Sequence, residues 1–315
     1  ISLWLPFLYL GLFVSILFGC AASNWFTLIV CMELNLIMIL PVLFYSVSLI
    51  SSEAVIIYLL AQSVGSLLIL LCVLVDSPAM VKIHSVDLVL FMALVLKFGV
   101  VPMHFWFIGL MSFSPALNFF LLSTSQKLLP TMLLVSAELF EYLLLILGLS
   151  ILVPMINLMS NKIKVMLAYS SVFQMALFFM ALQVGDKVGL MYFMIYCLTL
   201  IPVTFWLISR NNKVFINSMN ENKYKLVSLI SMAMIMGLPP FSMFLPKLYL
   251  LINSGNMILV LIILFVVLTI NMFIYLRLIS QISLYSSHLT TLSQNNKANL
   301  SILLFANLFP WLLLL

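Results

Sequence analysis

The chain has 315 residues, of which 65% are hydrophobic and 7% are charged, and its mean hydropathy is +1.31. A water-soluble protein of this length needs far more charge on its surface, so the composition excludes a soluble domain and indicates a membrane protein. The formal net charge of +5 does not indicate a nucleic-acid partner, because the basic residues form no run or patch.

Eleven apolar segments are long enough to cross a bilayer, which predicts an all-α polytopic membrane protein with 1–315 as a single transmembrane domain. The longest connections, 210–224 and 283–298, are polar and rich in Asn and Ser. The chain opens with Ile1, so we expect either a trimmed start or non-standard initiation. The predicted spans are 1–22, 24–48, 53–75, 86–110, 114–135, 139–158, 163–184, 188–209, 225–252, 257–282 and 299–315.

The basic residues between these spans predict the orientation of the chain. Loops on the side of the N-terminus hold seven of them, whereas opposite loops hold Lys82 and Lys187. This bias predicts that the N-terminus lies on the cytoplasm-equivalent side, and an odd number of spans places the C-terminus opposite. Arg277, near the end of the tenth span, is expected to snorkel to the interface. The seven are Lys162, Lys164, Arg210, Lys213, Lys223, Lys225 and Lys297.

The fourth span, 86–110, carries a lysine near its centre. At ~1.5 Å of rise per residue, Lys97 is more than roughly 15 Å from either end, too far to reach the interface. A charge at that depth costs at least ~2.5–3.5 kcal/mol, so a bundle interior, a water path or a counter-charge must offset it. Lys127, Lys247 and Glu33 are also expected deep in the membrane, and such a set predicts ion or proton conduction.

Two spans contain residues that interrupt a helix. In the fourth span, Gly99 and Pro102 follow the central lysine, and a proline removes a backbone donor from the helix. The ninth span has three prolines within eight residues, which cannot all fit an unbroken helix: Pro239, Pro240 and Pro246. Both spans are therefore predicted to be discontinuous, as in transporters that build ion sites at mid-membrane.

These two spans are five spans apart in the predicted order. A repeat of five spans has an odd count, so a second copy would be inverted in the membrane. We therefore predict inverted repeats over 1–135 and 139–282, followed by a C-terminal helix over 299–315. The similarity is confined to the breaks and the lysines, and no residue-level repeat can be aligned.

Polar residues near the lysines are candidates for a proton path. Burial favours the neutral amine of Lys97 and a nearby Glu33 carboxylate favours the ammonium, so their separation would control proton release. His104 lies two turns after Lys97 and is expected on the same helical face, either as a relay or as a capping or packing residue beside Trp106. Expected water-ordering neighbours are Ser123, Thr124, Ser125, Gln126, Tyr169, Ser170 and Ser171.

No motif for a cofactor is present. The four cysteines stand singly, which excludes a CxxC metal or iron–sulfur framework and argues against disulfides. The absence of GxGxxG and of a phosphate loop excludes a nucleotide or flavin site of those types. We therefore expect this chain to hold no cofactor and no metal. The cysteines are Cys20, Cys31, Cys72 and Cys197.

Several motifs follow one another in a fixed order. They are Met32-Glu33-Leu34-Asn35, Glu53-Ala54, the segment from Tyr58 to Gln62, and the segments 97–106, 126–130, 161–171 and 237–247. This ordered set resembles the antiporter-like subunit family of respiratory complex I and multisubunit cation/proton antiporters. Eleven spans resemble the animal mitochondrial form of that family, which is similar to the bacterial fourteen-span form without its first three spans.

The resemblance implies that Glu33, Lys97, Lys127 and Lys247 translocate protons, in that order along the membrane axis. It also implies that NADH, FMN, iron–sulfur clusters and ubiquinone are bound by other subunits. The expected partners are other membrane-arm subunits, including neighbouring antiporter-like ones, and lipids. The expected location is the mitochondrial inner membrane, with the N-terminus on the matrix side and the C-terminus on the intermembrane-space side.

Some positions depart from the family pattern, and two other hypotheses remain. Met243 replaces a small residue at the second break, and Gln174 stands where a histidine is common, which argues against a histidine relay in the seventh span. A multisubunit antiporter subunit is the first alternative, but it would be expected to keep fourteen spans. A non-catalytic membrane scaffold is the second, but it gives no reason for three lysines at mid-depth.

Overall fold

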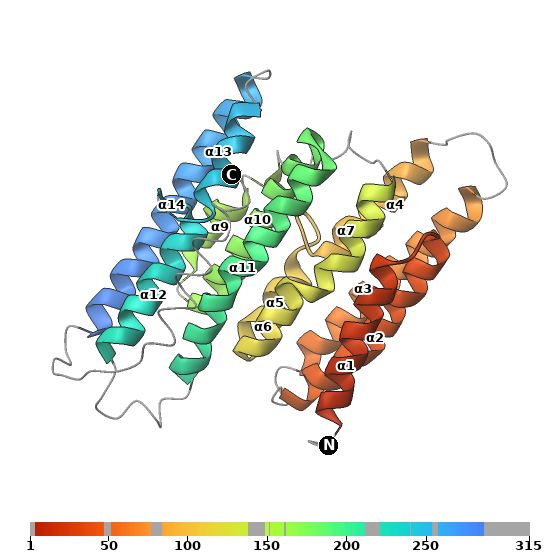
Figure 1. Ribbon diagram of the computed structural model, residues 1–315, viewed down its shortest axis with the longest axis horizontal. Coiled ribbons are helices and arrows are strands. Elements are labelled where there is room, and N and C mark those ends of the chain that lie inside the picture. Colours follow the sequence, from red (N-terminus) through yellow and green to blue (C-terminus); the bar gives the residue numbers. More distant parts are fainter. Residues whose placement is uncertain are drawn as a thin grey trace. The chain divides into compact units, whose positions relative to one another are not determined.

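The computed structural model describes residues 4–46, 52–76, 84–137, 149–150, 152–160, 162–211, 221–239, 241–253 and 258–286. All regular secondary structure within these ranges is helical (Figure 1). The all-α prediction is therefore confirmed for the described part of the chain. Lipid offers no hydrogen-bond partners to the backbone. A helix pairs the N–H and C=O groups of an apolar segment with one another, which explains why these segments are helical.

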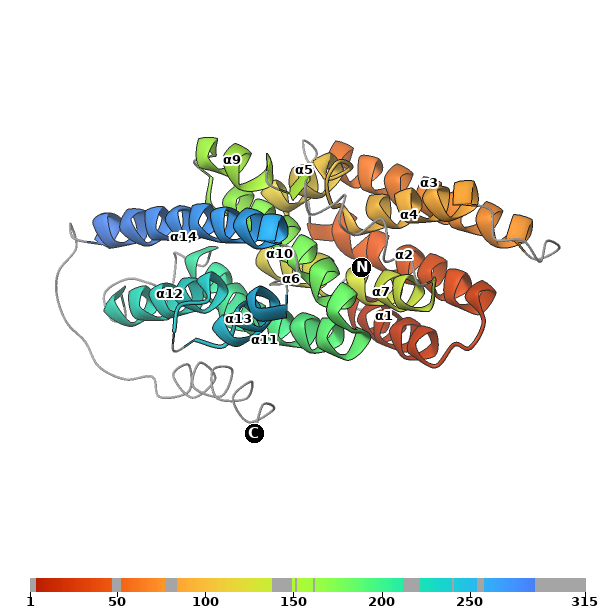
Figure 2. The ribbon, with the colours of Figure 1, turned by 90° about the horizontal axis from the view of Figure 1, so that it is seen from above.

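The first of two compact units comprises Ile1–Ser150 and Lys164–Ala176. Within it α1 packs on α2, α2 on α3 and α3 on α4, while α7 packs against α1, α2 and α4 (Figures 1 and 2). The helices of this unit are α1 (Leu5–Cys20), α2 (Trp25–Ser46), α3 (Ser52–Asp76), α4 (His84–Phe98), α5 (Phe105–Phe113), α6 (Ala116–Ser123), α7 (Ser125–Ala137) and the first part of α10 (Ile163–Val184).

The second compact unit comprises Ile151–Ile163 and Leu177–Leu315. Within it α12 packs against α11 and α14, and α9 and α13 also contact α14 (Figure 2). Besides the second part of α10, its described helices are α9 (Leu152–Met159), α11 (Asp186–Asn211), α12 (Glu221–Met236), α13 (Phe244–Asn253) and α14 (Ile258–Ser286).

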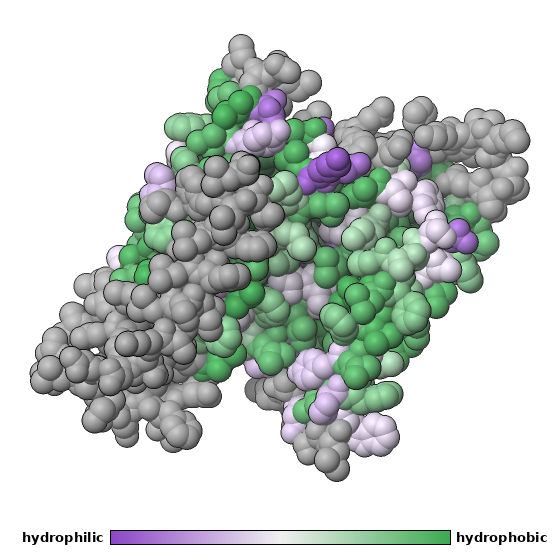
Figure 3. All heavy atoms as spheres, viewed as in Figure 1, coloured by the Kyte–Doolittle hydropathy of each residue, from purple (hydrophilic) through white to green (hydrophobic). Residues whose placement is uncertain are grey.

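Five of the described helical segments are long and apolar enough to cross a membrane, and their outer surfaces suit lipid. Phe26 on α2 and Leu67 on α3 are each 61% exposed, a state that water would penalise and acyl chains would not. The face drawn in Figure 3 is mostly hydrophobic over its described atoms. The chain is therefore a multi-pass membrane protein. The five segments are Trp25–Tyr45, Ser52–Val75, Ala116–Ala137, Ile163–Val184 and Asp186–Ile208.

Both predicted discontinuities are present in the structure. The fourth predicted span is divided into α4 and α5, and the ninth into α12 and α13. Gly99 and Gly237 directly follow the first half-helices with φ of 64° and 75°, a conformation that glycine adopts without a steric penalty. Pro102 and Pro239 lie between the half-helices, whereas Pro240 falls outside the described residues.

The structure adds one interruption to those predicted and removes one of the predicted helix breaks. Within the fifth span, 114–135, α6 ends at Ser123 and α7 starts at Ser125, so Thr124 alone interrupts the helical segment Ala116–Ala137. Pro246, predicted to break the ninth span, lies in the first turn of α13, where a missing backbone N–H costs no intrahelical bond. Most of the predicted span 139–158 and the whole of 299–315 lie outside the described residues.

Candidate functional site

The break in the fourth span begins with a glycine cap on α4. Gly99 N–H donates to the Leu96 carbonyl at 3.2 Å and Val100 N–H donates to the Val95 carbonyl at 3.3 Å, which is the Schellman pattern. A Cβ on Gly99 would lie 2.8 Å from Cζ2 of Trp106, so the close approach of the indole also requires glycine. The chain therefore leaves the helix within one residue of Phe98.

Lys97 occupies the last turn of α4 and is only 5% exposed. Its Nζ lies 3.7 Å from Sδ of Met32, and Glu33, the next residue on α2, interacts with it electrostatically. No direct ion pair joins Lys97 to Glu33, and Glu33 Oε1 is buried without a hydrogen-bond partner among the described residues. The predicted pair is thus brought into one neighbourhood, but it is not in direct contact.

Lys127 lies on α7, three residues after the interruption at Thr124, and is 2% exposed. Its Nζ stands over the ring of Phe107 at 4.5 Å from the centroid, an arrangement that stabilises the ammonium form. The preceding hydroxyls of Ser123, Thr124 and Ser125 donate to backbone carbonyls one turn earlier. Because each hydroxyl already donates its proton to a backbone carbonyl, it can only accept a hydrogen bond from water.

Gln126 was expected to order water, and in the structure it makes direct side-chain contacts. Its amide pairs with that of Asn35 on α2 and also accepts a hydrogen bond from the hydroxyl of Tyr58 on α3. Gln62, also on α3, donates to the backbone carbonyl of Lys97. Sequence reasoning missed Asn35, Tyr58 and Gln62 as neighbours of the lysines, although all three fall inside the family motifs.

His104 forms the N-terminal boundary of α5 and is 5% exposed. Its Nδ1 lies 3.2 Å from the carbonyl oxygen of Pro102, and its ring stacks on that of Phe105 and lies 6.2 Å, between centroids, from that of Tyr169. The expectation that it shares a helical face with Lys97 was wrong, because the helix is interrupted between them and its periodicity does not continue. The side chain makes no capping hydrogen bond to α5, and its ring contacts, with Phe105 and Tyr169, are of the packing kind.

The remaining predicted polar residues lie on α10, which is largely buried. Ser170 and Ser171 donate to the carbonyls of Leu167 and Ala168, three residues earlier. Gln174, one turn further along, is 1% exposed. At the start of the helix, Lys164 Nζ donates to the carbonyl of Ser114 at 2.8 Å, which caps the C-terminus of α5.

Lys247 lies in the first turn of α13 and reaches back across the second break. Its Nζ donates to the carbonyls of Ile235 and Met236 at 3.0 Å each, the last two residues of α12. These are carbonyls that an ending helix leaves without an intrahelical partner, and a cation also complements the helix dipole there. Met243, the departure noted in the sequence, is fully buried within this break.

Arg277 on α14, which was expected to snorkel to the interface, is partly exposed and hydrogen-bonds to a neighbouring helix. Its guanidinium donates from Nη1 to the carbonyl of Leu158, near the end of α9. Both residues belong to the second unit, so the arginine ties two helices of that unit together. Its charge is used for packing, and we assign it no part in proton movement.

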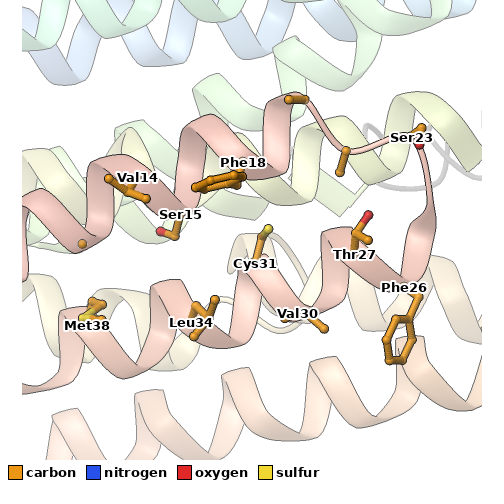
Figure 4. A pocket seen from close by; sticks show the side chains of 13 residues that line it. Val14, Ser15, Phe18, Ser23, Phe26, Thr27, Val30, Cys31, Leu34 and Met38 are labelled. Atoms are coloured by element: carbon orange, nitrogen blue, oxygen red, sulfur yellow. The ribbon is translucent and has the colours of Figure 1, made fainter.

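An open apolar groove of about 640 Å³ lies between α1 and α2 (Figure 4). Val14, Ser15 and Phe18 line it from α1, and Thr27 and Leu34 are among those that line it from α2. Neither Glu33 nor any of the buried lysines lines this groove. Such an apolar surface suits lipid rather than a proton, so the charged residues described above form the candidate site.

Known proteins share both the sequence pattern and the fold. The family model described as NADH:quinone oxidoreductase/Mrp antiporter, transmembrane, matches residues 22–273. NADH-ubiquinone oxidoreductase chain 2 of Lumbricus terrestris is 30% identical over 287 residues, covering 85% of this chain and 83% of that protein.

Two solved structures have the same fold. A chain of respiratory complex I from Thermus thermophilus has a TM-score of 0.75 at 18% identity, covering 97% of this chain and 76% of that one. A chain of the Mrp complex from Dietzia sp. also has a TM-score of 0.75, at 15% identity, covering 86% of this chain and 59% of that one. The chain belongs to the antiporter-like membrane subunit family of NADH:quinone oxidoreductases and Mrp antiporters, within the NADH-ubiquinone oxidoreductase chain 2 group.

Proposed function

We propose that this chain is a core membrane-arm subunit of a proton-pumping NADH:ubiquinone oxidoreductase. It moves protons through Glu33, Lys97, Lys127 and Lys247, while NADH oxidation and quinone reduction occur in other subunits. The family membership and the name of the Lumbricus relative support the assignment to this enzyme complex.

The observation that carries the proposal is the burial of three lysines at helix interruptions. Lys97, Lys127 and Lys247 are 5%, 2% and 6% exposed. Each stands within a few residues of a point where a predicted span is interrupted, and an ionisable group inside an apolar membrane domain is costly enough to indicate a functional role. A titratable amine beside an interrupted helix can exchange a proton with water that reaches the freed backbone groups.

Glu33 supplies a way to drive the exchange at Lys97. The carboxylate interacts electrostatically with the amine without a direct ion pair, so a small approach or withdrawal changes how strongly the ammonium is favoured. Its buried Oε1 has no hydrogen-bond partner among the described residues, and a buried carboxylate oxygen of this kind requires water or a proton. A conformational change elsewhere in the complex would shift the equilibrium between the ammonium and the neutral amine of Lys97 once per turnover.

We further propose the topology expected from the sequence. Eleven spans would form two inverted five-span repeats, 1–135 and 139–282, and a last helix over 299–315. The matching glycine caps at Gly99 and Gly237 support the repeat. The excess of basic residues on one side supports an N-terminus in the matrix and a C-terminus in the intermembrane space.

The complex would lie in the mitochondrial inner membrane, with neighbouring antiporter-like subunits and lipids as partners. NADH, FMN, iron–sulfur clusters and ubiquinone would be held by other subunits, and this chain would bind no cofactor and no metal. A role in a multisubunit cation/proton antiporter would use the same buried lysines. The Mrp likeness supports only the fold, however, whereas the relative at 30% identity is named as part of an oxidoreductase.

The test replaces Lys97 by methionine in the complete complex, with Lys187→Met at an exposed position as the matched control. NADH:quinone turnover and proton pumping are measured per assembled complex. We expect Lys97→Met to lower both by about tenfold or more, because redox turnover and pumping are tightly coupled. Full turnover with an unchanged number of protons per electron in the Lys97→Met variant would reject the assignment.

A further inference from the structure

Three polar side chains, of which Asn35 and Tyr58 are buried and Gln126 is partly buried, join α2, α3 and α7 at a single point. The amides of Asn35 and Gln126 form a reciprocal pair, with both N–H···O distances at 3.3 Å. The hydroxyl of Tyr58 donates to the same Gln126 oxygen, also at 3.3 Å. Asn35 is 3% exposed and Tyr58 is 1% exposed, so two of the three partners are buried among the helices. Gln126 is thereby held from two helices at once.

The inner face of α2 connects this junction to the Lys97 ammonium. Met32 precedes Asn35 by three residues, so the two side chains lie on one face about one turn apart. Met32 Sδ contacts Lys97 Nζ at 3.7 Å, and Asn35 holds Gln126. One helix face thus touches the amine of Lys97 and, on the next turn, the residue that precedes Lys127.

The inner face of α3 repeats this connection. Gln62 follows Tyr58 by four residues, which again places both on one face. Gln62 Nε2 donates to the Lys97 carbonyl at 3.2 Å, while Tyr58 donates to Gln126. Both α2 and α3 therefore contact Lys97 from one of their turns and Gln126 from the adjacent turn.

We propose that Asn35, Tyr58 and Gln126 form a positioning junction that fixes the spacing of Lys97 and Lys127, and that this spacing sets the rate of proton transfer between them. The inference rests on the proposed function. Amides do not titrate in the physiological range, so the role of the junction is geometric. A shift of one ångström in a donor–acceptor pair can slow a transfer substantially, and a doubly bridged junction restricts such shifts.

The experiment measures NADH:quinone turnover per assembled complex in H₂O and in D₂O. Gln126→Leu removes every side-chain hydrogen bond of the junction at similar volume, and we expect turnover to fall roughly threefold to tenfold. The solvent isotope effect should rise above that of the unmodified complex, because the misplaced proton transfer then limits the rate. Tyr58→Phe should shift both quantities in the same direction but less, and Tyr45→Phe, at an exposed phenol, should shift neither.

An exchange of the two amides separates positioning from simple loss of stability. Asn35→Gln together with Gln126→Asn keeps the pair at the same combined length, and we expect it to turn over faster than Asn35→Gln alone. An exchange variant no faster than the single variant would overturn the junction. So would a Gln126→Leu complex with reduced assembly but normal turnover and isotope effect per assembled complex.

Lys97→Met in the same assay separates failure of the proposed junction from failure of the proposed proton-pumping function. A slow Lys97→Met complex beside a normal Gln126→Leu complex rejects the junction and leaves the proposed function standing. A normal Lys97→Met complex rejects the proposed function and the junction with it.

Discussion

The two interrupted spans begin alike and then use their lysines differently. In each, a glycine with positive φ directly follows the first half-helix and donates to a carbonyl of its last turn. In the fourth span, Lys97 lies before the glycine, and its own carbonyl is satisfied by Gln62 from another helix. In the ninth span, Lys247 lies after the glycine, and its ammonium satisfies the free carbonyls.

This difference separates two tasks that a buried lysine can have. The ammonium of Lys97 donates no hydrogen bond to the free carbonyls at the end of α4. It contacts Met32 instead and interacts electrostatically with Glu33. Lys247 closes its break directly, and a change in its protonation alters how strongly the end of α12 is stabilised. A change in the protonation of Lys97 therefore alters its electrostatic interaction with Glu33. A change in the protonation of Lys247 instead alters its hydrogen bonds to the last carbonyls of α12.

Replacing Lys247 by methionine should produce the largest effect on assembly. It leaves two buried carbonyls without their charged donor, at about 1–3 kcal/mol each, so we expect little assembled complex. Lys97→Met removes no backbone partner and should assemble normally, although it turns over slowly. Native gel analysis of both variants tests the contrast, and equal assembly of the two would contradict it.

The glycine caps should differ in their tolerance of alanine. At Gly99 a Cβ would lie 2.8 Å from the Trp106 ring and 2.9 Å from Cβ of Phe107, whereas at Gly237 the nearest atoms are 3.1 Å and 3.2 Å away. Both positions also carry the left-handed cost of about 1–2 kcal/mol for a non-glycine residue. Thermal inactivation of the complex should therefore occur earlier in Gly99→Ala than in Gly237→Ala, and the reverse order would contradict the described packing.

A methyl group on Gly65 tests how tightly the stem of Lys97 is held. A Cβ there would lie 2.9 Å from Cγ of Lys97, so Gly65→Ala must displace the lysine. We expect turnover to fall roughly twofold to fivefold with near-normal assembly, through misplacement of the amine. Gly109→Ala is the matched control, since nothing lies within 4 Å of its Cβ, and equal rates in both variants would show that the position of Lys97 is not critical.

Lys164 offers a weaker version of the capping seen at Lys247. It donates to the carbonyl of Ser114, and it is only half-buried, whereas Lys247 is 6% exposed. Lys164→Met should lower stability by about 0.5–1.5 kcal/mol, seen as a small decrease in the temperature of inactivation. A loss as large as that of Lys247→Met would mean that the depth of burial does not determine the effect.

The sequence was sufficient to locate the buried charges and two of the interruptions. Hydrophobic runs identify apolar spans, a charge within such a run stands out, and glycine or proline beside it signals a break. The interruption at Thr124 was not foreseen, because it involves no glycine. Instead, the hydroxyls of three successive residues donate to backbone carbonyls four residues earlier, which competes with the regular helix.

The contacts between distant residues could not be predicted. Asn35 and Gln126 are 91 residues apart, and no periodicity in the sequence relates them. The reach of Lys247 back to Met236 depends on how the chain turns between two half-helices, which propensities do not specify. His104 and Lys97 do not share a helical face for the same reason, since helical periodicity ends wherever the helix ends.

A density map of the intact complex that resolves ordered water would test the proposed proton path directly. Glu33 acts electrostatically on Lys97 without a direct ion pair, so proton transfer between them requires water. We predict ordered waters that link the Lys97 amine to Glu33 on one side and toward Lys127 on the other. Dry apolar contacts filling both gaps would contradict the proposed proton path.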